Sequence, residues 1–423
     1  MRTSLVPLLI PTVVVFVCSC ARETQSAARW DGSVRDSAGI QIVENFGEPL
    51  WRQGEEWKLV ADLRIGVRDG PPEYQFGRIT GFVELSDGRI VVADGMAPKI
   101  RFYSGDGEHL YSVGQEGSGP REFGQGGLSP LRGYGDTLLV SDPRNYQVHK
   151  FAPDGTWLSS FSVRPEGGWR SAGWDTDPSG MIVSLLEPLQ LPDQPVADTM
   201  SVVAVRHFDG TLGDTIGRVP MSRNLRFAGD SPELYFYAPL PDIDLRWDGG
   251  LVTGRSDRYE LSWSYADGRP ERIVRLLRDP TPFTGAEQAT LMERFEALLA
   301  HLAPERLQQI KNAIRFTDTY PYYRRFMCGP KGTLWLRRVR PISEMGSEEI
   351  EALDMNRRPR PGSGWDVFDD RGRYLGIVEA PLELPIGLLM GDRMFGIMKD
   401  ELDVQYVQIW RIEGLDREVV SAG

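Results

Sequence analysis

The sequence predicts an all-β fold: a six-bladed β-propeller of four-stranded blades, closed by an N-terminal strand and carrying a small helical insertion. Short alternating strands are separated by two-residue turns, and these turns recur at two fixed places in a repeat of about 45–50 residues, which is typical of propeller blades. The first turn of each repeat is expected at Asp87-Gly88, Gly135-Asp136, Ser179-Gly180, Asp248-Gly249, Lys331-Gly332 and Gly391-Asp392, and the second at Asp106-Gly107, Asp154-Gly155, Asp209-Gly210, Asp267-Gly268 and Arg371-Gly372.

Blade one shows the repeat most clearly. Its strands, named A to D from the central channel outward, are expected at residues 82–85, 89–93, 100–103 and 109–113. Glycine suits the turns because it adopts positive φ without steric cost. Strands B and C of the later blades are expected at 137–141 and 147–151, 181–185 and 201–208, 250–253 and 258–264, 333–339 and 365–368, and 394–398 and 404–410.

The sixth blade lacks a strand D, because the chain nearly ends after residue 410. An apolar segment upstream of blade one, Trp57 to Ile65, has no partner before it. We therefore predict that this segment completes blade six and closes the ring, which removes the free sheet edges. The propeller then spans residues 57–414, with 415–423 as a C-terminal tail. Seven blades are the alternative, if residues 29–56 contain further strands.

The linkers before blades one and two also repeat. Gly70-Pro71-Pro72-Glu73-Tyr74 matches Gly119-Pro120-Arg121-Glu122-Phe123, and Asp94 and Asp142 each end a strand B. In these features the chain resembles the bacterial six-bladed β-propeller lipoproteins related to NHL repeats, over about residues 57–414. The resemblance implies the fold only. Propellers of this kind include binding modules, scaffolds, lactonases and lyases, so the fold does not select an activity.

The first nineteen residues have the features of a lipoprotein signal peptide. Arg2 precedes an apolar run from Leu5 to Val17, which is too short to span a bilayer. The run ends in Val17-Cys18-Ser19-Cys20, which resembles a lipobox with Cys20 as the acylated residue; an ordinary secretory signal is the alternative. Residues 20–56 then form a tether and N-terminal extension. We expect an exported, lipid-anchored protein of the cell envelope, at the outer membrane or periplasmic face if the cell has two membranes.

Composition limits the classes of partner. Loss of residues 1–19 removes one charge, that of Arg2, and changes the net charge from −12 to −13. An acidic chain binds nucleic acid poorly and is repelled by anionic lipid. With Cys20 acylated, Cys328 has no partner for an intramolecular disulfide. The core must therefore supply the stability, and 41% apolar residues are enough for one.

Loop lengths indicate which face of the disc is functional. In antiparallel blades the A–B and C–D turns share one face, here called the short-turn face, and the B–C loops and D–A links share the other, the long-loop face. The long insertions 187–200, 340–364 and 281–320 all fall on the long-loop face. The insertion 284–315 is expected to be helical: Thr284 and Glu287 form a capping-box pattern before an apolar stripe. It is either an amphipathic hairpin packed on the propeller or a lid over the channel mouth.

Arginine and tyrosine residues concentrate around blade five of this acidic chain. Guanidinium groups beside aromatic rings suit anionic or sugar-like ligands, so we predict a binding site here; solvated or internally paired arginines are the alternative. By strand alternation, one of Arg324 and Arg325 should face the channel. The candidate ligand-binding residues are Arg324, Arg325, Arg337, Arg338, Tyr322 and Tyr323.

Enzymatic motifs are scarce. The sequence has no GxSxG, HExxH, P-loop or CxxC pattern, and its four histidines form no close ligand pair. Asp94, Asp142 and Asn145 could supply oxygen ligands to a divalent cation, although an aspartate at the end of strand B more often stabilises its own turn. We predict a lipid-anchored, non-catalytic propeller that needs no cofactor and binds a ligand or protein partner through its long-loop face. The alternatives are a metal-dependent hydrolase or lyase with its site at the central channel mouth, and a structural envelope protein.

Overall fold

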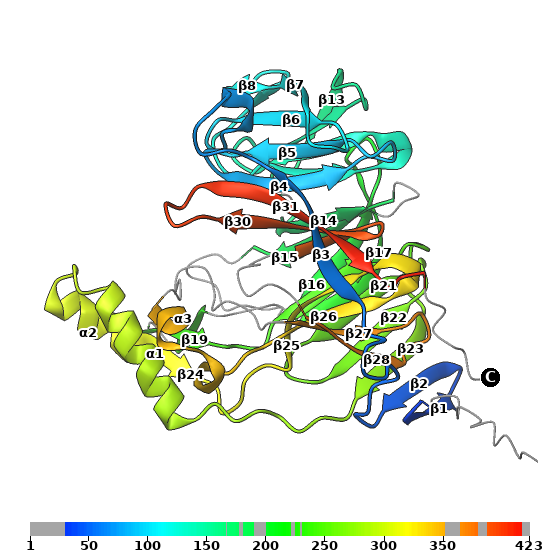
Figure 1. The fold of residues 1–423 in the computed structure, drawn as a ribbon, viewed down its shortest axis with the longest axis vertical. Helices are drawn as coiled ribbons and strands as arrows, with labels where there is room; N and C mark the ends of the chain where they lie inside the picture. The colour runs from blue at the N-terminus through cyan, green and yellow to red at the C-terminus, as the bar shows by residue number, and fades with distance from the viewer. Residues whose placement is uncertain are drawn as a thin grey trace, which may run out of the picture.

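A computed structural model describes residues 30–165, 167–176, 181–189, 200–220, 225–228, 231–351, 364–379 and 387–416. Six sheets are arranged in a ring, and Figure 1 shows the molecule from the side, with blade one at the top. From blade one to blade six, the innermost strand of each blade lies next to that of the following blade, and the ring closes where blade six contacts the innermost strand of blade one. The prediction of a six-bladed propeller is confirmed.

From the channel outward, the strands of each blade follow chain order and pair antiparallel, and blades four and six gain further outer strands from the N-terminal segment. The strands are β4 (Ile79–Glu84), β5 (Ile90–Asp94), β6 (Lys99–Tyr103) and β7 (His109–Val113) in blade one; β10 (Ser129–Arg132), β11 (Leu138–Asp142), β12 (Gln147–Phe151) and β13 (Trp157–Ser162) in blade two; β14 (Trp169–Thr176), β15 (Ile182–Pro188), β16 (Met200–Arg206) and β17 (Leu212–Pro220) in blade three; β20 (Pro241–Leu245), β21 (Leu251–Arg255), β22 (Glu260–Ser264) and β23 (Pro270–Leu276) in blade four; β25 (Tyr323–Cys328), β26 (Leu334–Arg338), β27 (Gly364–Phe368) and β28 (Tyr374–Glu379) in blade five; and β29 (Gly387–Met390), β30 (Arg393–Lys399) and β31 (Gln405–Glu413) in blade six.

The N-terminal strand closes the ring as predicted. β3 (Lys58–Ile65) pairs antiparallel with β31, from Lys58 opposite Glu413 to Ile65 opposite Val407. Blade six thus has the order β29-β30-β31-β3. Trp57 and Ile65 are buried at the two ends of this strand, so closure also fills the core between neighbouring blades.

Blade four contains two strands that the sequence analysis did not assign. β1 (Gly32–Ser37) and β2 (Ile40–Asn45) form a hairpin, and β2 pairs in parallel with β23, so this blade has six strands. The alternative of a seventh blade is thereby excluded for residues 30–56. The hairpin is held by Asn45, whose buried side chain donates to the carbonyl oxygens of Arg275 and Gly372 and accepts from Trp30 Nε1.

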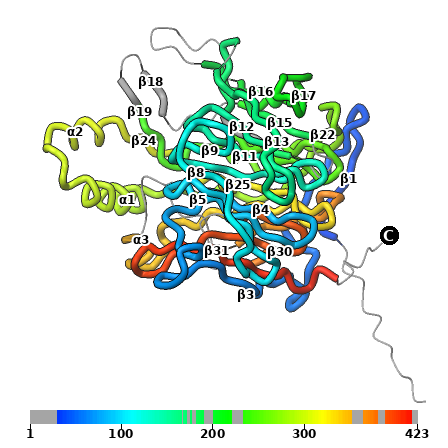
Figure 2. Tube along the Cα trace, turned by 90° about the horizontal axis from the view of Figure 1, so that it is seen from above, coloured from blue at the N-terminus to red at the C-terminus, as the bar shows by residue number. Residues whose placement is uncertain are grey.

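The predicted helical insertion consists of α1 (Gly285–Leu298) and α2 (Pro304–Ala313), and Thr284 and Glu287 form the expected capping box. The helices join a small sheet of β18 (Leu225–Ala228), β19 (Ser231–Phe236) and β24 (Ile314–Phe316), and the short helix α3 (Ser347–Glu351). We call these elements the accessory module. Figures 1 and 2 both show its helices on the opposite side of the molecule from β1.

The apolar stripe of α1 packs inside the accessory module. Leu291 and Phe295 are buried against Phe236, Tyr237 and Ile342, so the stripe is covered largely by other inserted segments of the long-loop face. Among the described residues, no helix is long and apolar enough to cross a bilayer.

Ten of the eleven predicted turns lie in described residues, and the glycine of each has positive φ, as these turns require. The Ser179-Gly180 turn lies outside the described residues. The remaining short elements are β8 (Gln115–Glu116), β9 (Glu122–Phe123), and the 3₁₀ turns η1 (Pro72–Tyr74), η2 (Tyr134–Asp136), η3 (Pro330–Gly332) and η4 (Ile342–Glu344).

Candidate functional site

Of the two tyrosines of the predicted blade-five site, Tyr323 lies in the protein interior and Tyr322 is partly buried beside it. Tyr323, the first residue of β25, is buried, and its ring centroid is 6.0 Å from that of Tyr259 in blade four. The ring of Tyr322 meets the same tyrosine edge-on at 5.6 Å. Both rings therefore contribute to the packing between blades four and five.

Arg337 and Arg338 end β26 on the long-loop face, as expected, but they differ in environment. Arg337 is buried with its guanidinium 4.9 Å from the centre of the Trp365 ring, and burial lowers its pKa to about 10. Arg338 is half-exposed, with Nε 3.8 Å from a carboxylate oxygen of Asp366.

Asp366 is a buried junction between blades four and five. Its carboxylate accepts hydrogen bonds from the hydroxyls of Tyr259 and Tyr374, both at 2.7 Å, and from Arg278 Nη1 at 3.1 Å. Burial raises the pKa of both tyrosines, and the neighbouring carboxylate raises them further. All these groups satisfy one another, which indicates a structural role.

Arg324 and Arg325 point in different directions. The Arg324 guanidinium lies 5.7 Å from the centre of the Tyr237 ring in the accessory module. Arg325 is exposed and interacts electrostatically with Asp175 and Asp244 on the inner strands of blades three and four. The six predicted ligand-binding residues are thus distributed over the core, the accessory module and the channel.

Aspartates link the inner strands of blades three, four and five. Asp175 accepts a hydrogen bond from the backbone N–H of Leu245 at 3.2 Å, and Asp242 accepts one from Phe326 at 2.8 Å. Asp244 accepts one from Cys328, and its carboxyl group lies close enough to that of Asp175 for the two to affect each other's titration. Burial raises the pKa of both Asp175 and Asp244, and the Asp175 charge raises that of Asp244 further.

This carboxyl pair predicts a stability that depends on pH. Because the folded state holds a proton more tightly than the unfolded chain, the stabilisation is complete below the ordinary aspartate pKa and is lost as pH rises through the raised values. In Asp244→Asn the amide donates to Asp175 without a shared proton. The unfolding free energy of both proteins is measured at pH 5 and at pH 8. We expect its decrease over this range to be about 1 kcal/mol smaller in the variant than in the unmodified chain. Urea unfolding at both pH values measures the difference, and parallel losses in the two proteins would contradict it.

The candidate metal ligands Asp94, Asp142 and Asn145 belong to turns. Asp94 accepts backbone N–H groups of Gly77 at 3.0 Å and Met96 at 3.0 Å, and Asp142 accepts that of Gly124 at 2.9 Å and the Asn145 side chain at 2.8 Å. Each aspartate ties its own B–C turn to the preceding linker. Within the described residues no three His, Cys, Asp or Glu side chains are grouped to hold a metal ion. Cys20, the predicted lipidation site, lies outside the described residues.

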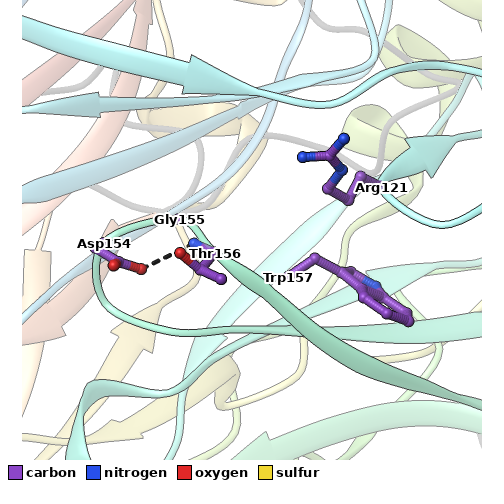
Figure 3. Close-up of a pocket in the computed structure, with 5 residues that line it drawn as sticks. All are labelled: Arg121, Asp154, Gly155, Thr156 and Trp157. Atoms are coloured by element: carbon purple, nitrogen blue, oxygen red, sulfur yellow. Dashed lines mark hydrogen bonds between the residues drawn. The ribbon is translucent and has the colours of Figure 1, made fainter.

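A cavity of about 360 Å³ lies at the outer rim, between blades one and two. The C–D turn of blade two forms one side of it and leans on strand D of blade one, where Tyr111 donates to the carbonyl oxygen of Pro153 at 3.2 Å. Gly155 allows this approach, because a Cβ there would lie 2.9 Å from the Tyr111 ring. The cavity is lined by Arg121, Asp154, Gly155, Thr156 and Trp157 (Figure 3).

Arg121 enters this pocket from the repeated linker before blade two. Its backbone has φ of 63°, a left-handed conformation that costs energy for a residue with a Cβ. Glu122 holds the linker in place: its carboxylate accepts the backbone N–H groups of Ser118 at 3.1 Å and Gly119 at 2.8 Å, and these hydrogen bonds lower its pKa. The Arg121 guanidinium is exposed and has no ion-pair or hydrogen-bond partner in the described part of the chain.

Trp157 and the turn residues complete the pocket. Trp157, the first residue of β13, is half-buried, and its indole Nε1 is a buried donor without an acceptor among the described residues. Asp154 accepts the backbone N–H of Thr156 at 2.9 Å, which lowers its pKa and keeps it ionised. Figure 3 shows Arg121 and the Asp154–Thr156 pair on different sides of the pocket. The pocket thus combines a guanidinium, an aromatic ring, a carboxylate and a hydroxyl.

The sequence contained one signal for this pocket. The linkers before blades one and two match closely, yet Arg121 stands where the first linker has Pro72. Arg121 is therefore the position at which the two linkers differ in charge.

Comparison with known proteins gives structural neighbours only. No family model matches the sequence, and no curated protein sequence matches it. Solved structures with a similar arrangement include a presumed exported protein of Bacteroides fragilis (10% identity, 88% of this chain and 99% of that chain, TM-score 0.48) and a member of the DUF4221 family from Bacteroides vulgatus (12% identity, 85% and 98%, TM-score 0.49). A gluconolactonase from Xanthomonas campestris is similar over 83% of this chain and 98% of its own, at 12% identity and a TM-score of 0.39.

Proposed function

We propose that this chain is an exported, lipid-anchored propeller that binds, without transforming, a small ligand carrying both a carboxylate and hydroxyl groups, such as an acidic sugar. One observation carries the proposal: Arg121, held in a left-handed backbone conformation, extends into a cavity beside Trp157 a guanidinium that has no partner among the described residues. The cavity volume of about 360 Å³ is within the range of small-molecule sites. Export and acylation at Cys20 rest on the sequence of residues 1–20.

Each group in the pocket has a counterpart on such a ligand. The planar guanidinium of Arg121 can bind a carboxylate through two parallel hydrogen bonds. The Trp157 ring offers an apolar surface on which a sugar ring can stack. The Asp154 carboxylate and the Thr156 hydroxyl can accept and donate hydrogen bonds to sugar hydroxyls.

The same residues support binding over catalysis. Of the five residues that line the pocket, Asp154 is the single carboxylic acid, and its pKa is lowered. General acid–base catalysis needs a proton donor and an acceptor with pKa values near the working pH. This set offers one carboxylate that stays charged and an arginine that stays protonated.

Titration calorimetry with D-glucuronate and D-glucose tests the proposal. We expect the purified chain to bind glucuronate, and glucose at least about tenfold more weakly, because glucose lacks the carboxylate that pairs with Arg121. Arg121→Gln should weaken glucuronate binding by about tenfold or more and leave glucose binding nearly unchanged.

Arg164→Gln is the matched control. Like Arg121, Arg164 is an exposed arginine in a link between blades, but its link comes after blade two. Its guanidinium lies 5.7 Å from the centre of the Tyr146 ring and does not line the cavity. Its replacement should leave glucuronate binding unchanged. Equal affinity for glucuronate and glucose, or equal losses in the two arginine variants, would contradict the proposal.

A further inference from the structure

Blade four presents large exposed aromatic side chains at both turns of its short-turn face. Trp247, between β20 and β21, is 65% exposed, and Tyr265, between β22 and β23, is 47% exposed. Phe208 in a turn of blade three and Tyr134 in a turn of blade two are exposed on the same face. Trp and Tyr in such positions combine an apolar ring with a polar group, a combination that favours membrane–water interfaces.

The charges near these aromatic residues are balanced, although the chain as a whole is acidic. Arg269 pairs with Asp267 at 2.7 Å, Arg246 pairs with both Asp248 and Glu271, and Arg272 lies 3.8 Å from Glu271, so three arginines offset three acidic side chains. This end of blade four is therefore close to neutral, although the chain as a whole has a net charge of −12. A neutral surface with exposed Trp and Tyr side chains can approach a lipid headgroup layer without electrostatic repulsion.

The turn that carries Trp247 is held firmly. Arg246 lies 5.2 Å from the centre of the Trp263 ring, in addition to its two ion pairs. The indole of Trp247 reaches the neighbouring blade, where its Nε1 would be 3.0 Å from a Cβ at Gly332. The turn thus holds this ring in an exposed position. Little conformational entropy is therefore lost when the ring enters a lipid headgroup layer.

The N-terminal segment also reaches the propeller at blade four. Trp30, the first described residue, donates to Asn45 at 2.8 Å at the outer edge of that blade. Nine residues lie between Trp30 and Cys20, so the two Cα atoms are at most about 35 Å apart when the segment is fully extended. Acylation of Cys20 would therefore keep blade four close to the bilayer.

We infer that the short-turn face at blade four rests on the lipid bilayer, with Trp247 and Tyr265 inserted in the headgroup layer. This inference rests on the lipid-anchor part of the proposed function and is independent of the ligand. Blade four lies opposite blade one in the six-bladed ring. A contact made by the blade-four edge of this face would leave the pocket between blades one and two at the opposite edge of the ring, farthest from the bilayer.

Vesicle sedimentation tests this contact separately from the anchor. A chain that begins at Ala21 lacks Cys20 and keeps every described residue. We expect it to bind neutral phosphatidylcholine vesicles weakly, and Trp247→Ser to lower its partition coefficient by about tenfold. Tyr265→Ser should lower the coefficient by a smaller factor, and circular dichroism confirms that each variant is folded.

Tyr146→Ser is the matched control, because Tyr146 is 46% exposed and lies in the B–C turn of blade two, on the long-loop face. Its replacement should leave partitioning unchanged. The inference is overturned if the unacylated chain fails to bind neutral vesicles, if it binds only anionic ones, or if Tyr146→Ser and Tyr265→Ser weaken binding equally. Failure of the anchor is distinguished by mass spectrometry of Cys20 in the exported protein, and failure of the ligand proposal by glucuronate titration.

Discussion

A chain that begins at residue 66, without the closing strand β3, is expected to lose the cooperative unfolding transition of the propeller. β3 pairs with the whole length of β31, and Trp57 and Ile65 fill the adjoining core. Without them, β31 becomes an exposed apolar edge strand, which promotes association between chains. Size-exclusion chromatography should show oligomers or aggregates, and thermal unfolding should become broad.

A chain that begins at residue 48 provides the comparison. It lacks the β1–β2 hairpin, which adds to the outer edge of blade four, but it keeps β3. We expect it to remain monomeric and to unfold cooperatively at a lower temperature than the complete chain. A chain from residue 66 that unfolds as sharply as the chain from residue 48 would show that β3 is dispensable for ring closure.

Asp366→Ala is expected to cost about 3–5 kcal/mol of unfolding free energy, the usual cost of breaking a buried ion pair by removing one partner. The change leaves the Arg278 guanidinium and the hydroxyls of Tyr259 and Tyr374 without their common acceptor. Asp366→Asn should cost less, because the amide oxygen still accepts hydrogen bonds. Urea unfolding at pH 7 measures both variants.

Asp267→Ala is the control for Asp366→Ala. Asp267 also pairs with an arginine, Arg269, but both side chains are exposed, and surface pairs contribute little to stability. We expect its unfolding midpoint to be close to that of the unmodified chain. If Asp366→Ala were equally mild, the buried junction between blades four and five would have no role in stability.

Local patterns were sufficient to predict most of the blades. The turns define where strands begin and end, so His109–Val113 and Gln147–Phe151 were predicted with their exact bounds. Ring closure by residues 57–65 could be predicted because an apolar strand at one end and an incomplete blade at the other require each other. These inferences need only periodicity, turn chemistry and the burial of sheet edges.

Long-range pairing accounts for the strands that were missed. β1 has the sequence GSVRDS and is largely exposed, so it lacks the alternation of a core strand. Its hairpin joins β23, more than two hundred residues away, in parallel. No local pattern specifies that partner. The β18–β19 hairpin, between blades three and four, was missed as well, and β19 pairs with the distant β24.

Residues that are close in the sequence are not always close in the fold. Arg337 and Arg338 are neighbours in the chain, yet strand alternation directs the first against Trp365 and the second toward Asp366. The cavity instead combines Arg121 from a linker with residues 154–157 from a turn more than thirty positions later. These residues come together because blade two packs against blade one, and that packing is part of the tertiary structure.

A crystal structure of the chain with D-glucuronate tests the central claim most directly. The account predicts glucuronate in the cavity between blades one and two, with its carboxylate paired to the Arg121 guanidinium and its ring against Trp157. Glucuronate bound elsewhere, in the central channel beside Arg325 for example, with the cavity at Arg121 holding only water, would contradict it.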